Sequence, residues 1–166
     1  MPLFFSILVT SNFMTSYNNS IIFIKNGKSK VMRFAISYVS TANRDLNQDE
    51  VAELLELTEV RNNEQGVNGL LIYSGGNFFE VIVGEETKIK DLFENIKEDP
   101  RHRNIMMVFE KKISKQLFED EKANFISENT QHRQMKVENF LYYIQDLDES
   151  TQKAVKNILV AMGKNS

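Results

Sequence analysis

The 166-residue chain contains no cysteine and no tryptophan, only two prolines and only two histidines. Without cysteine there can be no disulfide framework, no thiol nucleophile and no thiolate metal site. The two histidines, His102 and His132, are too few and too far apart in sequence for a zinc site, so we expect no metal. The lack of disulfides fits a reducing compartment, and we expect a cytoplasmic protein.

Charge of neither sign dominates, because the formal net charge is -3 at pH 7. A nucleic-acid-binding surface needs clustered lysine and arginine, so we expect no nucleic-acid partner. The apolar stretch over residues 2–9 is too short to cross a membrane. It also lacks the basic lead and the cleavage pattern of a secretory signal. We therefore expect no membrane partner.

The chain length is that of one domain with extensions. Met32 stands directly before the first strand of that domain, which we place at residues 32–126. Residues 127–166 are predicted to form a C-terminal helical extension. Two interpretations of residues 1–31 stay open: an unordered or misassigned start, or an added strand or helix.

Hydrophobic periodicity predicts alternating strands and helices. Asn47 and Glu50 have the spacing of a capping box that opens a helix. The predicted order in the domain is strand 34–39, a helix after Asn47, two strands within residues 66–84, a helix over 86–97, a strand from Ile105 to Phe109, and a short strand over 122–126. This β-α-β-β-α-β order is that of a ferredoxin-like α+β sandwich. Two further helices, over 136–145 and 149–162, carry apolar stripes that should pack on the open face of the sheet or on a partner.

The most informative segment is the predicted hairpin over residues 66–84, in which apolar runs flank Gly75-Gly76. In the second strand, Phe78, Glu80 and Ile82 share one face, and the residues between them share the other. Because both faces are apolar, Glu80 should point at covered surface. An unpaired charge costs several kcal/mol there. Glu80 therefore needs a partner, a proton or nearby water.

This hairpin and three other segments resemble, in order and at matching spacing, the BLUF domain, a blue-light sensor that uses FAD. The resemblance covers about residues 33–125, and no single motif in it is specific by itself. The segments are Gly66-Val67-Asn68-Gly69 with Tyr73-Ser74-Gly75-Gly76, then Asn77-Phe78-Phe79, Phe34 to Ser40, Thr58 to Asn63, and Asp99-Pro100-Arg101-His102.

By this resemblance, Tyr38 is the tyrosine that donates an electron and a proton to the photoexcited flavin, although periodicity alone favours a core residue. Asn62 would hydrogen-bond the flavin ring, with Asn63 as the alternative after a one-residue slip and a helix C-cap as the structural alternative. Arg101 and His102 would lie near the ribityl or phosphate side of the flavin. Without the resemblance, Arg101 and His102 would be expected to face solvent, because they lie in a polar turn.

The sequence departs from the family pattern at positions that matter for signalling. Glu80 falls where the family has a glutamine that bridges the tyrosine and the flavin. An ionised Glu80 could only accept hydrogen bonds, whereas a protonated one could donate once and accept once, like an amide. Burial favours the protonated form. Glu121 and Ala123 stand where the family has a tryptophan and a methionine in the fifth strand.

We therefore expect an FAD-binding blue-light photoreceptor domain, not an enzyme, with Tyr38 and Glu80 as the photochemical residues. The expected cofactor-binding residues are Tyr38, Asn62, Glu80, Arg101 and His102. Output would pass by contact with a second copy of the chain or with a downstream signalling protein. The alternatives are a photochemically silent BLUF-like interaction module, with or without flavin, and a small acylphosphatase-type hydrolase. The hydrolase would need an arginine after Gly66-Val67-Asn68-Gly69.

Overall fold

The computed structural model describes residues 14–17, 20–25, 28–114, 125–129 and 147–164. The strands are β1 (Met14–Tyr17), β2 (Ser20–Lys25), β3 (Lys28–Ala42), β4 (Asn68–Ser74), β5 (Asn77–Gly84), β6 (His102–Ser114) and β7 (Phe125–Asn129). The helices are α1 (Gln48–Glu64), α2 (Glu86–Glu98) and α3 (Glu149–Lys164).

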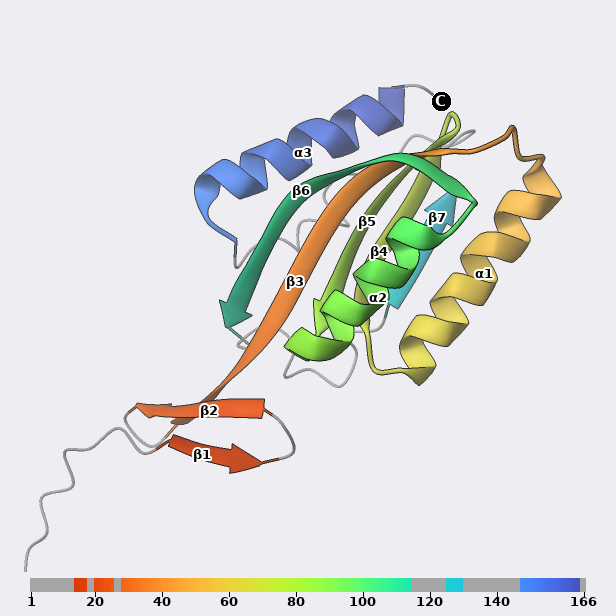
Figure 1. The fold of residues 1–166 in the computed structure, drawn as a ribbon. Coiled ribbons are helices and arrows are strands. Elements are labelled where there is room, and N and C mark those ends of the chain that lie inside the picture. The colour runs from red at the N-terminus through yellow and green to blue at the C-terminus, as the bar shows by residue number, and fades with distance from the viewer. Residues whose placement is uncertain (1–13, 18–19, 26–27, 115–124, 130–146, 165–166) are drawn as a thin grey trace, which may run out of the picture.

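The central sheet has the strand order β6-β3-β5-β4, with all neighbours antiparallel. Strand β7 adds to the outer edge of β4 in parallel orientation. Helices α1 and α2 cover one face of the sheet and α3 lies on the other (Figure 1). This arrangement confirms the predicted ferredoxin-like α+β fold.

Strands β1 and β2 lie within the range that we predicted as an N-terminal extension. They pair with each other, and β2 pairs with the beginning of β3, so this small unit continues from one end of the sheet (Figure 1). The predicted fifth strand began at residue 122, but the structure describes β7 only from Phe125. The predicted helix over 136–145, together with Glu121 and Ala123, falls outside the described residues.

Local sequence signals account for the elements that position the site. Asn47 and Glu50 form the predicted capping box, with both side-chain-to-backbone bonds at 3.0 Å. Gly75 and Gly76 both have positive φ, of 52° and 79°, as a two-residue hairpin turn requires. Helix α1 therefore begins, and the β4–β5 hairpin turns, where the sequence predicts.

The alternation predicted for β5 is also confirmed, and it divides the interior into two cores. Phe78 and Ile82 pack with Tyr38, Leu55 and Phe93 beneath α1 and α2. The residues between them on β5 pack under α3, against its predicted apolar stripe: Phe79, Val81 and Val83 with Val155, Leu159 and Met162.

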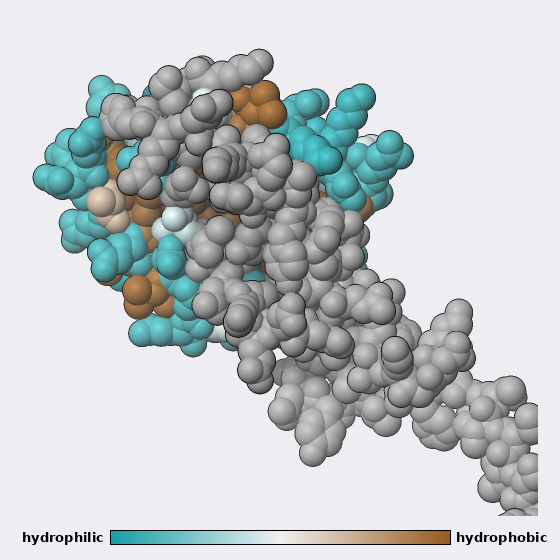
Figure 2. All heavy atoms as spheres, turned by 180° about the vertical axis from the view of Figure 1, so that it is seen from behind, coloured by the Kyte–Doolittle hydropathy of each residue, from teal (hydrophilic) through white to brown (hydrophobic). Residues whose placement is uncertain are grey.

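The end of α3 is tied to the hairpin, because Ser74 Oγ donates to the carbonyl oxygen of Met162 at 2.8 Å. From behind (Figure 2), the described surface is mostly hydrophilic, with small hydrophobic patches. No described helix is long and apolar enough to cross a membrane.

Candidate functional site

A cavity of about 250 Å³ lies beneath α1 and α2, against the sheet. All five residues predicted to bind a cofactor line it: Tyr38, Asn62, Glu80, Arg101 and His102. They come from β3, α1, β5, the turn after α2 and the beginning of β6. The structure thus brings together groups that are up to 64 residues apart in sequence, from Tyr38 to His102.

Three buried polar side chains form the wall of this cavity. Tyr38 and Glu80 are direct cross-strand partners, and the Tyr38 hydroxyl donates a short hydrogen bond to Oε2 of Glu80. The side chain of Asn62, at the end of α1, also hydrogen-bonds to Glu80. Each of the three is at most 5% exposed. Glu80 therefore has the partners that its burial demands.

Burial dominates the ionisation of this cluster. Desolvation raises the pKa of Glu80 from 4.5 to about 7, although the hydrogen bonds from Tyr38 and Asn62 and the charge of Arg101 act in the opposite direction. Burial, then the charge of Glu80, hold the pKa of Tyr38 well above its usual value. Below pH 7 the Glu80 carboxyl is thus mainly neutral and can donate one hydrogen bond and accept others.

Arg101 lines the cavity, and its side chain is paired with Asp99. Its guanidinium and its backbone N–H both bond to the Asp99 carboxylate, with Nε to both carboxylate oxygens at 2.9 Å. This pairing holds the pKa of Asp99 below its usual value. Sequence reasoning did not assign Asp99 a role, although the i, i+2 spacing of Asp99 and Arg101 around Pro100 was a usable signal.

His102 closes another side of the cavity. Its Nδ1 lies 2.8 Å from Ser40 Oγ, and its ring centroid lies 4.8 Å from that of Phe78 and 6.2 Å from that of Tyr38. Burial lowers the pKa of His102, which favours the neutral imidazole. A neutral ring packed between aromatic side chains supplies shape and one hydrogen-bonding nitrogen rather than charge.

The structure also distinguishes between Asn62 and Asn63, the two asparagines that the sequence offered as flavin ligands at the end of α1. Asn62 is buried on the cavity, whereas Asn63 is exposed and lines neither this cavity nor its neighbour. Further lining residues that the sequence did not single out include Arg61, Gln65 and Asn95. Arg61 and the C-cap residue Gln65 lie one turn apart at the end of α1, and Asn95 lies on α2.

Fold and cavity together define a small α+β ligand-binding domain with a buried tyrosine–carboxyl–amide cluster. A family model described as "BLUF: Sensors of blue-light using FAD" matches residues 34–124. The chain belongs to the BLUF family, whose members sense blue light with FAD.

Individual relatives agree with this assignment. The chain is 31% identical over 121 residues to the photoactivated adenylate cyclase subunit beta of Euglena longa, an alignment that covers 72% of this chain and 14% of that protein. It is 31% identical over 75 residues to the blue light- and temperature-regulated antirepressor BluF of Escherichia coli, covering 45% of this chain and 19% of the relative. The chain therefore matches only a small part of each of these relatives.

Solved structures support the fold. A structure titled BlrP1 BLUF has a TM-score of 0.62 at 19% identity and covers 79% of this chain and 90% of that one. A complex of Klebsiella pneumoniae BlrP1 with manganese and cyclic diGMP has a TM-score of 0.61 at 20% identity, covering 77% of this chain and 33% of that one.

Proposed function

We propose that this chain holds the flavin ring of FAD in the cavity beside Glu80 and acts as a blue-light sensor. The observation that carries the proposal is the Tyr38–Glu80–Asn62 cluster. Three buried polar side chains from three elements meet at one cavity wall, and their hydrogen bonds leave Glu80 able to bond a ligand as well. A cavity of this kind fits a flat, mostly apolar ring with a polar edge.

Each residue has a distinct task in this proposal. Asn62 offers an amide donor and acceptor to the polar edge of the ring, and Arg101 faces the anionic end of the cofactor. The Tyr38 hydroxyl donates its hydrogen bond to Oε2 of Glu80. The bound flavin supplies the absorption of blue light and the acceptance of an electron from the protein.

Glu80 is the residue that can change its bonding. In its neutral form it has one proton to give and one lone-pair oxygen to offer, so rotating the carboxyl exchanges the two roles between Tyr38 and a ligand. This ability resembles that of an amide. We infer that such an exchange is the switch and that the neutral form is the competent one.

The signal would leave the domain by contact rather than by catalysis within this chain. We propose a second copy of the chain or a separate signalling protein as the recipient and the cytoplasm as its location. Relatives with "photoactivated adenylate cyclase" in their names match this chain over a small part of their length, which is consistent with a sensor that acts on something outside itself. We propose residues 32–126 as the boundaries of the sensor domain.

The test is an absorption spectrum of the full chain, purified with flavin and recorded before and after blue light. We expect a bound-flavin spectrum that shifts slightly to the red and recovers in the dark. Tyr38→Phe should keep the flavin, because the volume of the side chain is nearly conserved. It should abolish the shift, because it removes the hydroxyl that donates to Glu80.

Two results would contradict the proposal. A chain that binds no flavin would leave the cavity without its ligand. A full light-induced shift in Tyr38→Phe would mean that Tyr38 is only a core residue. Val39→Ile is a matched control on the same strand, because Val39 points to the α3 side and should leave the spectra unchanged.

A further inference from the structure

The last turns of α1 are anchored to the sheet by polar side chains at two points. At one point, the Asn62 side chain hydrogen-bonds to Glu80 on β5. At the other, the carboxylate of Glu59 accepts two hydrogen bonds from Ser127 on β7, the strand against which α1 packs (Figure 1). Glu59 and Asn62 are three residues apart, so they lie one turn apart on the same side of the helix.

The anchor between Glu59 and Ser127 has a defined geometry. Oε2 of Glu59 accepts from the backbone N–H of Ser127 at 2.9 Å and from its hydroxyl at 2.7 Å. The same hydroxyl lies 3.2 Å from the carbonyl oxygen of Leu55, one turn earlier in α1. Both Glu59 and Ser127 are half-buried. Because hydrogen bonds to a carboxylate are strong and directional, this anchor resists a slide or rotation of α1 on β7 that apolar packing alone would allow.

Both anchors end on one row of residues across the sheet. Ser127 is the register partner of Leu71 on β4. Leu71 is in turn the cross-strand partner of Glu80, which pairs with Tyr38. Directly opposed residues share a face of the sheet, so Ser127 and Glu80 lie two strands apart, about 10 Å, on the face that α1 covers. Two anchors on one row fix the rotation of α1 about its axis.

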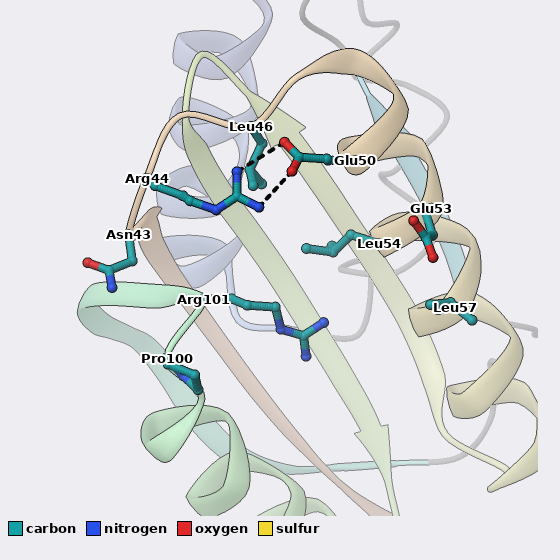
Figure 3. Close-up of a pocket in the computed structure, with 9 residues that line it drawn as sticks. All are labelled: Asn43, Arg44, Leu46, Glu50, Glu53, Leu54, Leu57, Pro100 and Arg101. Atoms are coloured by element: carbon teal, nitrogen blue, oxygen red, sulfur yellow. Dashed lines mark hydrogen bonds and ion pairs between the residues drawn. The ribbon is translucent and has the colours of Figure 1, made fainter.

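Glu59 is not in contact with the space where a ligand would lie. It lines neither the cavity of Glu80 nor the larger hollow of about 520 Å³ between the β3–α1 connection, the first turns of α1 and the turn after α2 (Figure 3). Ser127 lines neither space. A change at Glu59 therefore reaches the cavity through the helix that carries Asn62 rather than by contact with a ligand.

We propose that Glu59 and Ser127 are positioning residues for the Asn62 amide. The amide keeps its donor and acceptor aimed at the cavity because its helix is also held at Glu59. Without the Glu59 carboxylate, the helix end can rotate and carry the amide away from Glu80. A preorganised amide binds a ligand more tightly than one that must first be reoriented. This inference rests on the proposed function, since the ligand is the flavin ring.

The test is titration of the flavin-free full chain with FAD and with riboflavin, which carries the ring without phosphate. Glu59→Ala should weaken both ligands by the same factor, about fivefold, because Asn62 meets the ring that they share. Ser127→Ala should weaken them about twofold, since its backbone N–H still donates to Glu59. Glu59→Gln should stay within about twofold of the wild type, because one amide oxygen can accept both bonds.

Three comparisons separate a positioning role from a general loss of stability. In an Asn62→Ala background, Glu59→Ala should weaken FAD binding no further, because the group that it positions is already gone. Glu56→Ala removes an exposed carboxylate from the same helix and should leave both affinities unchanged. In the flavin-free chain, nitrogen-15 NMR should show faster exchange of the Asn62 side-chain amide protons in Glu59→Ala but not in Glu59→Gln.

The outcomes separate this inference from the proposed function. If the wild-type chain binds neither ligand, the proposed function is wrong, and unchanged Asn62 exchange in Glu59→Ala would overturn the positioning role as well. If the wild type binds both ligands and Glu59→Ala binds them as tightly, only the positioning role is wrong. The same conclusion follows if Glu59→Ala costs as much in the Asn62→Ala background as alone, or if Glu59→Gln weakens binding as much as Glu59→Ala does.

Discussion

Replacing Glu80 with glutamine should change how the stability of the flavin-free protein depends on pH. Glu80 is 3% exposed, and its pKa rises from 4.5 to about 7 because burial disfavours the carboxylate. Between these two values the unfolded chain has released the proton while the folded chain still holds it. Stability should therefore fall as pH rises through this window and be flat above it.

The size of the effect follows from the same two pKa values. A rise from 4.5 to about 7 is worth about 3 kcal/mol when it is fully expressed, since one pKa unit corresponds to about 1.4 kcal/mol. Between pH 5 and pH 8 about 2.5 kcal/mol of this should appear. Glutamine has nearly the same shape, can accept from Tyr38, and has no charge to desolvate. The free energy of unfolding of the Glu80→Gln variant, relative to that of the wild type, should thus rise by about that amount between pH 5 and pH 8.

Urea unfolding of both proteins at pH 5 and pH 8 measures this directly. Other titrating groups, including His102 and Asp99, are present in both proteins, so most of their contributions cancel in the difference. Glu56→Gln, at an exposed position of α1, is the control for removing a carboxyl group outside the buried cluster. A Glu80→Gln difference that does not change with pH would refute the reasoning. It would mean that Glu80 already ionises freely in the folded protein.

Three further substitutions test the packing of the sheet. Gly69→Ala should cost on the order of 3 kcal/mol or more in urea unfolding, because its φ is +141° and an added Cβ would lie 1.9 Å from the carbonyl oxygen of Val81. Gly76→Ala, with open space around it, should cost only about 1 kcal/mol, and equal costs would count against the steric argument. Ser37→Ala should be neutral or stabilising by up to about 1 kcal/mol, because its buried hydroxyl has no hydrogen-bond partner among the described residues. A loss of more than about 1 kcal/mol in thermal or urea unfolding would show that the hydroxyl is satisfied in solution.

The elements that the sequence predicted well are those with local causes. The Asn47–Glu50 capping box and the Gly75-Gly76 turn depend on residues within a few positions, and both formed as expected. The burial of Glu80 also followed from alternation within a single strand. The sequence could predict that Glu80 needs a partner. It could not predict that the partner is Tyr38, because this contact spans 42 residues and depends on the register of β3 against β5.

The parts that escaped prediction depend on long-range approach. The position of β7 is set by its parallel pairing with β4. Nothing in the sequence of Phe125–Asn129 predicts which strand β7 pairs with or in which direction. The hollow lined by Asn43, Leu54 and Arg101 forms because the β3–α1 connection meets the turn after α2, where the Asn43 N–H donates to the carbonyl oxygen of Arg101 at 2.9 Å. The sequence places Leu57 close to leucines that pack on the sheet, and only the fold shows that Leu57 is exposed beside a hollow.

The two cores on either side of the sheet share no residue, although β3 and β5 contribute alternately to both. Substitutions under α3 and substitutions around the cavity should therefore combine almost independently in their effects on stability. A lineage could rebuild the surface that α3 presents to a partner without retuning the chemistry around Glu80. The single layer of backbone between the cores works as a partition across which two selective pressures can act separately.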